Sequence, residues 1–300
     1  MAAVAALSEK DQSRLRQVMY ECQNNRENVA LRLMQWARDE PKWETVALEM
    51  VHAILEDARR DLPVKEDRTD AFVRNVDALG GAAYLRQLEE TVKTQNALYP
   101  NTFFGLMTLR SGYLRGAETP FQLIVRVAVA LGGGDPDTTA TMSTLMIKKK
   151  ISFATPVLFH AGVAGGNLAS CYLLSMEQHQ DDVRGIWSSL KDLATISSAC
   201  GGLGVAASAL GSVRAEDAGG LLQRFLRPLN EMCRSVNPGN GKRRSSCAVY
   251  LEMHHPSLLS FLEMRQTHGD PNARCHDLFS AVWVSDLFMR RVQNGETWSF

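Results

Sequence analysis

The first half of the chain places its apolar residues at helical spacing. Apolar positions recur at intervals of three and four residues, which puts them on one face of a helix. A capping-box pattern, with Ser8 followed three residues later by Asp11, marks the start of the first such stretch. The pattern predicts helices over the segments 8–23, 28–40 and 44–60.

The segment 116–150 predicts two further helices. A glycine-rich stretch that ends in Pro136 interrupts its apolar periodicity, and such a stretch breaks a helix. The lysine run Lys148–Lys150 is typical of the basic last turn of a helix. We therefore expect residues 1–150 to form a mainly helical N-terminal region.

After residue 150 the pattern changes to short apolar runs, bounded by glycine, that alternate with helical stretches. Buried strands are predicted for LASCYLL, GGLGVAAS, CAVYLEM and LFSAVWV, and helices for DVRGIWSSLKDLATISSA, GLLQRFLRPLNEMCRS and SDLFMRRVQNG. Alternating strands and helices are typical of a parallel sheet or barrel. The chain is therefore expected to be an α/β protein, with its sheet in residues 151–300.

Composition argues against a membrane or a nucleic acid as partner. The chain has 33 basic and 33 acidic residues, so no global field attracts either polyanion. Its longest apolar run is interrupted by Arg126, and the N-terminus has no signal-peptide pattern. A soluble globular protein is expected.

Six cysteines are spread over the chain without a C-x-x-C pair. This usage argues against a zinc site and favours a reducing compartment such as the cytoplasm. In that setting a cysteine is usually a small buried core residue. On this ground alone Cys171, in GGNLASCYLLSM, would also be interpreted as a buried core residue. No metal site is expected.

Two glycine-rich motifs are candidates for nucleotide sites. Residues 202–207 (GLGVAA) fit the G-x-G-x-x-A form, but a helix precedes the glycines and a strand follows, which is the reverse of the dinucleotide-binding arrangement. The stretch 237–255 could bring a basic loop close to a phosphate or could be a solvated turn, and it lacks P-loop spacing. The adjacent His254 and His255 point in different directions, so we interpret them as structural.

Several segments together resemble a known family. Five segments occur in the order and approximate spacing of class I ribonucleotide reductase large subunits. They are FFGLMTLRSGYL, FATPVLFHAG, NLASCYLLSM, SSACGGLGVAAS and the stretch from GNGKRRSSCAVYLEMHH to VSDLFMRRV. The resemblance covers about residues 95–300. It implies a helical N-terminal region followed by the first half of a ten-stranded α/β barrel. No ATP-cone domain is recognisable in residues 1–94, as in herpesvirus-type large subunits.

The resemblance also implies roles for individual residues. Cys171 matches one cysteine of the redox pair that reduces the substrate ribose and closes to a disulfide. Thr155 and Ser170 match positions that bind the substrate diphosphate or ribose, and Gly202 matches a glycine-rich turn that lets the backbone approach the nucleotide. The implied substrate is a ribonucleoside diphosphate. The implied partners are a small subunit, which would carry a di-iron or dimanganese radical site, and a second large subunit; no cofactor is implied in this chain itself.

Two regulatory segments depart from the family pattern. Lys242 and Arg243 lie in the stretch that matches the substrate-specificity loop, where Pro238 replaces a glutamine and stiffens the backbone. Asp181 or Asp182 can fill the acidic position of the effector site, but Ser198 stands where a lysine is expected. We therefore expect weak or absent control by deoxynucleotides.

The family's N-x-C-x-E segment, which holds the radical cysteine, does not occur in this sequence. The chain is therefore expected to be a fragment that lacks reductase activity alone and exposes an apolar sheet face. Three functions remain open: the N-terminal part of a reductase, a catalytically silent homologue that acts as a protein-interaction scaffold, and an unrelated nucleotide-binding α/β protein. A reading frame that continues into N-x-C-x-E would favour the first.

Overall fold

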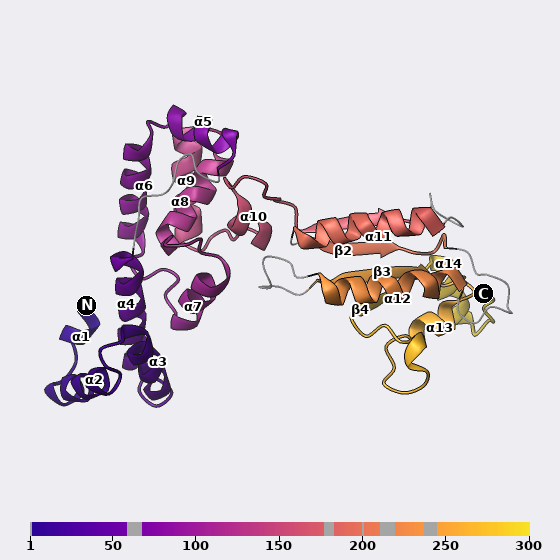
Figure 1. Cartoon of the computed structure of the whole chain (residues 1–300), viewed down its shortest axis with the longest axis horizontal. Helices are drawn as coiled ribbons and strands as arrows, with labels where there is room; N and C mark the ends of the chain where they lie inside the picture. Colours follow the sequence, from indigo (N-terminus) through magenta and orange to yellow (C-terminus); the bar gives the residue numbers. More distant parts are fainter. Residues whose placement is uncertain (1, 59–67, 177–182, 200, 211–219, 237–244) are drawn as a thin grey trace. The chain divides into compact units, whose positions relative to one another are not determined.

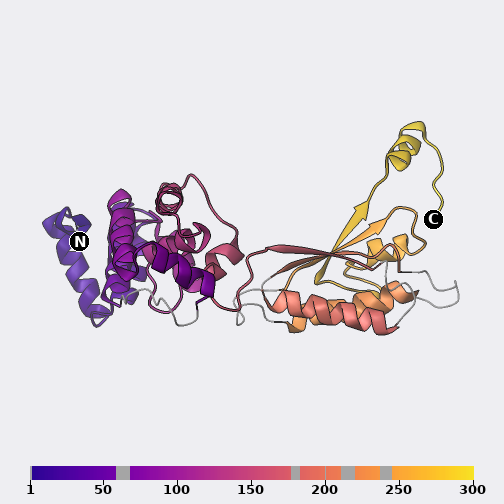
Figure 2. The same cartoon turned by 90° about the horizontal axis from the view of Figure 1, so that it is seen from above.

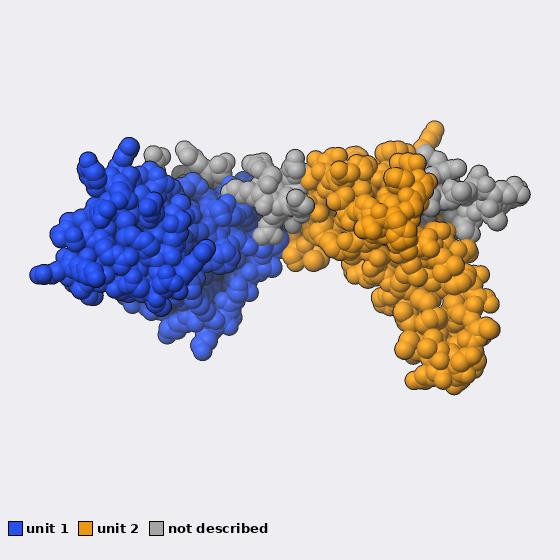
Figure 3. Space-filling view, turned by 90° about the horizontal axis from the view of Figure 1, so that it is seen from below, with its two compact units in different colours: residues 1–168 blue, residues 169–300 orange. Residues whose placement is uncertain are grey.

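The computed structural model describes residues 2–58, 68–176, 183–199, 201–210, 220–236 and 245–300. The chain divides into two compact units, Met1–Leu168 and Ala169–Phe300, which Figure 3 shows in blue and orange. Each has its own hydrophobic core. The units are therefore described separately.

The first unit is helical. Its helices are α1 (Ala2–Ala5), α2 (Glu9–Glu21), α3 (Arg26–Trp36), α4 (Lys42–Asp57), α5 (Asp70–Ala78), α6 (Ala82–Gln95), α7 (Phe103–Gly112), α8 (Pro120–Leu131), α9 (Pro136–Ile147) and α10 (Thr155–His160), as labelled in Figure 1. The predicted helices are confirmed, including the Ser8 cap, whose hydroxyl accepts a hydrogen bond from the backbone of Asp11. The short helix α10 was not predicted, because its six residues are too few to show a helical period.

Helix α8 is buried on all sides in the middle of this unit. Its residues from Pro120 to Val129 are buried, including the charged Arg126. A full capping box starts the helix: the Thr119 hydroxyl accepts from the backbone of Gln122, and the Gln122 side chain accepts from the backbone of Thr119. An apolar helix with this strong start forms the centre around which the others pack.

The second unit alternates strands and helices. Its elements are β1 (Cys171–Ser175), α11 (Val183–Ser198), β2 (Gly202–Ala206), α12 (Gly220–Ser235), β3 (Cys247–Glu252), α13 (Leu258–Glu263), a 3₁₀ turn (Pro271–Ala273), β4 (Leu278–Trp283) and α14 (Asp286–Asn294). The strands are parallel in the order β1-β2-β3-β4. All four predicted strands are confirmed, and α11, α12 and α14 confirm the predicted helices. The prediction that all four are buried is wrong for β1 and β4, which are largely exposed because they lie at the two ends of the described sheet.

One face of this sheet is packed against helices. Alternate residues of β2 and β3 point to that face and are buried together with side chains of α11 and α12. Figure 2 shows both helices on the same side of the strands. The opposite face carries Leu173, Phe279 and Trp283, whose exposed fractions are 83%, 49% and 64%. The expected exposed apolar face is therefore present in the part of the chain that the structure describes.

The second unit also tests the motif interpretations. Gly202–Ala206 is itself strand β2, preceded by α11, which is not the strand–turn–helix order of a dinucleotide fingerprint. His255 is buried and structural, because its ring contacts the carbonyl of Leu210 at 2.9 Å and the amide of Ser257 at 3.0 Å. His254 lies 3.3 Å from the Glu252 carboxylate, and its side chain is exposed.

Candidate functional site

Cys171 is the first residue of β1, and its thiol is free and exposed. Side chains alternate between the two faces of a strand, and the neighbouring residues of β1 fix which face Cys171 occupies. It shares its face with Leu173, on the side of the sheet away from α11 and α12. The core interpretation of this cysteine is therefore wrong, whereas Cys233, Cys247 and Cys275 are buried.

A row of residues at the starting edge of the sheet accompanies Cys171. Gly202 is its register partner on β2, while Ser246 and Asp277 directly precede β3 and β4. Parallel strands begin at the same edge, so these four residues lie in a row there. Cys171 and Gly202 are on the open face, whereas the Asp277 side chain turns toward α12. The sheet thus brings a thiol, a hydroxyl and a carboxylate to one edge, with a glycine between them.

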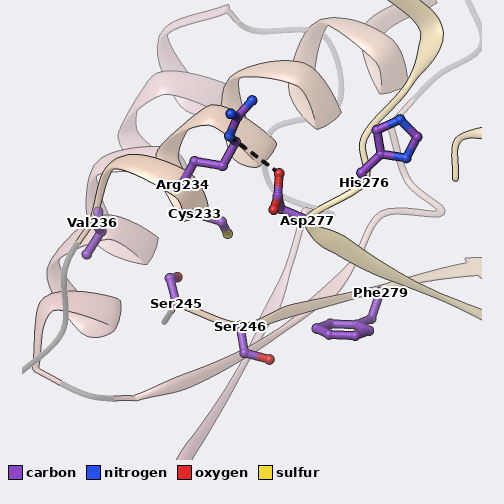
Figure 4. Close-up of a pocket in the computed structure, with 8 residues that line it drawn as sticks. All are labelled: Cys233, Arg234, Val236, Ser245, Ser246, His276, Asp277 and Phe279. Carbon is purple, nitrogen blue, oxygen red and sulfur yellow. Dashed lines mark ion pairs between the residues drawn. The ribbon is translucent and has the colours of Figure 1, made fainter. Parts of the chain in front are cut away.

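Asp277 is held in place by helix α12. Its backbone amide donates to the side-chain oxygen of Asn230 at 2.9 Å, and its carboxylate lies 3.6 Å from the Arg234 guanidinium. A cavity of about 600 Å³ opens here. Figure 4 shows the side chains that line it. Its walls are Cys233, Arg234, Val236, Ser245, Ser246, His276, Asp277 and Phe279. The edge therefore combines a concave space with polar groups of both charges.

Ser170 and Gly202 are joined through their backbones. The amide of Gly202 donates to the Ser170 carbonyl at 2.8 Å, and the side chain of Ser170 is exposed. The structure therefore brings Ser170, Cys171 and Gly202 together, as the sequence predicted for a substrate site. Their binding roles stay a prediction.

Thr155 belongs to the other unit, where it is the first residue of α10. Its hydroxyl lies 3.1 Å from the hydroxyl of Tyr113. The far end of α10 is held by Arg126, which donates to the carbonyls of Leu158 and Ala161 at 3.0 and 2.9 Å. Thr155 thus starts a helix whose end is fixed to the core.

The remaining predicted site residues lie outside the described part of the chain. These are Lys242 and Arg243 of the specificity loop and Asp181 and Asp182 of the effector site. Ser198 is described as the last residue of α11, and its hydroxyl donates to the Thr195 carbonyl at 2.7 Å. The prediction of weak effector binding stays open.

No group of three or more His, Cys, Asp or Glu side chains suited to a metal ion occurs among the described residues. Within the same residues, no helix has the length and apolar character needed to cross a membrane. The chemistry that the described edge offers is therefore that of a thiol, hydroxyls, a carboxylate and basic side chains.

Comparison with known proteins shows the family of this chain. The sequence profile of the ribonucleotide reductase barrel domain matches residues 169–300, and that of the ribonucleotide reductase all-alpha domain matches residues 99–166. The chain belongs to the ribonucleotide reductase large-subunit family. The boundary between the two matched domains coincides with the division between the helical unit and the sheet unit of this chain.

Individual relatives agree with the family assignment. The chain is 38% identical over 208 residues to the ribonucleoside-diphosphate reductase large subunit of Plasmodium falciparum, covering 66% of this chain and 26% of that protein. The large subunit of Arabidopsis thaliana is 39% identical, covering 66% and 25% of the two chains, and that of Caenorhabditis elegans is 34% identical, covering 79% and 30%. The chain thus spans about a quarter of the length of these relatives.

A solved structure has the same fold. The class Id ribonucleotide reductase alpha subunit of Actinobacillus ureae superposes with a TM-score of 0.54 at 16% identity, covering 63% of this chain and 34% of that one. The helical region followed by a parallel α/β region is therefore the reductase architecture.

Sequence reasoning missed Ser246, Asp277 and the cavity beside them. The available signal was their position directly before two predicted strands, because residues that precede parallel strands meet at one edge. Which of those residues face away from the helices depends on the register, which the sequence pattern did not fix.

Proposed function

We propose that this chain supplies the substrate-binding edge and one redox thiol of a ribonucleoside-diphosphate reductase. The observation that carries the proposal is the position of Cys171: a free, exposed thiol on the open face of the barrel-domain sheet, beside Ser170 and Gly202. A thiol placed only for packing would be buried among apolar side chains.

The proposed reaction reduces the ribose of a ribonucleoside diphosphate. Two thiols give up two electrons and two protons and close to a disulfide. One proton leaves with the 2′-hydroxyl as water, and the two electrons and the other proton form the new C–H bond at the 2′-carbon. Cys171 supplies one thiol, and we place the second in the part of the protein that corresponds to the remaining length of the relatives. External dithiol then reduces the disulfide for the next turnover.

In this proposal further residues, from both units, bind and orient the substrate. The hydroxyls of Ser170 and Thr155 donate to the diphosphate or ribose oxygens. Gly202 has no side chain, so the backbone of β2 can approach the nucleotide beside the thiol. A small subunit with a di-iron or dimanganese site supplies the radical, and a second large subunit completes a homodimer.

The test uses protein from the complete reading frame, assayed with its small subunit and a dithiol. Cys171→Ser is expected to abolish multiple turnover and to leave substrate affinity within about tenfold, or ~1.4 kcal/mol, because serine keeps the shape but carries no redox sulfur. Cys22→Ser is the matched control, since Cys22 packs against the helical core, and it should retain activity. Full dithiol-dependent turnover of Cys171→Ser would contradict the proposal.

A second function, a protein-interaction scaffold, is favoured by one observation. Pro238 stands where the family's specificity loop has a glutamine, which removes a polar side chain and stiffens the backbone. If the complete protein binds its small subunit but turns over no ribonucleoside diphosphate, the scaffold function replaces the enzymatic one.

A further inference from the structure

Two buried thiols in the sheet unit contact each other. Cys233 lies in the last turn of α12 and is 5% exposed, while Cys247 is the first residue of β3 and is fully buried. Side chains of β3 alternate between the two faces of the sheet, so Cys247 points to the face that α11 and α12 cover and its neighbour Ala248 to the other. There its thiol shares a hydrogen bond with the thiol of Cys233.

Further hydroxyls are arranged around this pair. The Ser245 side chain is hydrogen-bonded to Cys233, and the Ser245 hydroxyl lies 2.6 Å from that of Ser197 on α11. Cys233 therefore has two hydrogen-bonding neighbours, Cys247 and Ser245. Hydrogen bonds donated to a sulfur favour its thiolate form.

The two thiols are therefore chemically unlike. Hydrogen bonding from Cys247, and then from Ser245, lowers the pKa of Cys233 despite the opposing effects of burial and of the Asp277 charge. The hydrogen bond to Cys233, together with burial, raises the pKa of Cys247. Cys233, the thiol of the pair that lines the cavity of about 600 Å³, is thus the one placed to act as the nucleophile, with Cys247 as the proton donor.

A small polar reagent in the cavity can reach Cys233, whereas Cys247 is not accessible from the cavity. Cys233 lines the cavity of about 600 Å³, together with Arg234 and His276. Figure 4 shows its sulfur directed into the space between Ser245 and Asp277. Cys247 does not line this cavity, so a reagent in it meets Cys233 first.

We propose that Cys233 and Cys247 form a peroxide-sensitive dithiol that closes to a disulfide. The Cys233 thiolate attacks hydrogen peroxide: a sulfur–oxygen bond forms, the O–O bond breaks, and the leaving hydroxide takes a proton to become water. The Cys247 sulfur then attacks the sulfenic acid, and a second water leaves. Two thiols are oxidised by two electrons, one peroxide is reduced to two waters, and a dithiol reverses the change.

This pair is separate from the proposed ribose-reducing thiol. Cys171 lies on the open face of the sheet, whereas Cys233 and Cys247 meet on the helix-covered face. The disulfide joins the last turn of α12 to the first residue of β3, at the two ends of the connection 234–246. Oxidation therefore fixes both ends of that connection, whether or not the protein reduces ribonucleotides.

The inference is tested on the purified 300-residue chain by mass spectrometry after treatment with excess hydrogen peroxide. Trypsin releases Cys233 in peptide 225–234 and Cys247 in peptide 245–265, because the Arg227–Pro228 bond resists cleavage. The expected result is one cross-linked species of these peptides, about 2 Da lighter than their sum through loss of two hydrogens, which disappears with dithiol. Recovery of both peptides unlinked, with both thiols free for alkylation, would overturn the inference.

Single variants separate the two roles. Cys247→Ser should leave Cys233 as a sulfenic acid that a dimedone probe labels, whereas Cys233→Ser should leave Cys247 unlabelled. Cys275→Ser is the matched control: Cys275 is buried in the same core, and burial raises its pKa to about 11, so the cross-link should form unchanged. Equal labelling of Cys233 and Cys247 would overturn their assignment, and the wild-type cross-link decides the case even if a variant fails to fold.

Discussion

Cys171 and Gly202 are register partners on adjacent parallel strands, and the sulfur of Cys171 lies 3.7 Å from where a β-carbon on Gly202 would stand. The same β-carbon would stand 3.3 Å from the Ser170 carbonyl oxygen. The absence of a side chain at position 202 therefore keeps space open beside the thiol.

Adding side-chain volume at Gly202 is expected to hinder Cys171. Gly202→Ala forces a shift of a few tenths of an ångström at the Ser170 carbonyl and should cost about 1 kcal/mol of stability. Gly202→Val should also slow alkylation of the Cys171 thiol, measured with iodoacetamide. Gly112→Ala is the control, because nothing lies within 4 Å of its added carbon. Unchanged alkylation in Gly202→Val would show that the space serves no purpose for the thiol.

Thr155→Val is expected to weaken substrate binding in the complete enzyme. The change removes the hydroxyl but keeps the shape, and a lost hydrogen bond to a charged group costs about 1.5–3 kcal/mol, so KM should rise about tenfold or more. Tyr113→Phe removes the hydroxyl 3.1 Å away while keeping that of Thr155, and should change KM less. An unchanged KM in Thr155→Val would assign this hydroxyl a structural role only.

The buried pair of Arg126 and Glu118 is expected to dominate the stability of the helical unit. The guanidinium donates to the carboxylate at 2.7 and 3.1 Å, and both side chains are at most 4% exposed. Arg126→Met leaves the Glu118 charge buried and should cost about 3–5 kcal/mol in urea unfolding. Arg126→Met combined with Glu118→Leu should cost less than the single change. As a control, Arg26→Ala breaks an exposed pair with Asp57 and should cost less than about 1 kcal/mol.

Acid is expected to loosen the contact between α2 and the start of α4. Hydrogen bonds from Lys42, and then from Arg14, lower the pKa of the Glu40 carboxylate from 4.5 to about 2. Because the folded pKa lies below the unfolded one, the stabilisation is present above pH 4.5 and is lost as the pH falls toward 2. Thermal unfolding followed by circular dichroism should show a smaller fall in Tm over this range for Glu40→Gln than for wild type. Parallel curves for the two proteins would contradict the assignment.

The amino-acid sequence by itself determined that residues 1–150 are mainly helical, the helices α2, α3, α4, α8 and α9, the four strands and their alternation with α11, α12 and α14. These features follow from the local spacing of apolar residues and from caps such as Ser8, which act within a few residues. The sequence also determined the family through motifs spread over about residues 95–300, and the matched domains confirm it.

Only the tertiary structure decided which cysteines are exposed and which meet. Cys171 and Cys247 both lie in predicted strands, yet one faces open space and the other the helices, because the register and the helix layer assign opposite faces to them. Cys233 and Cys247 are separated by a long connection, and packing of α12 on β3 brings them together. Ser246 and Asp277 join Cys171 at one edge for the same reason: parallel pairing aligns strand starts that lie far apart in the chain.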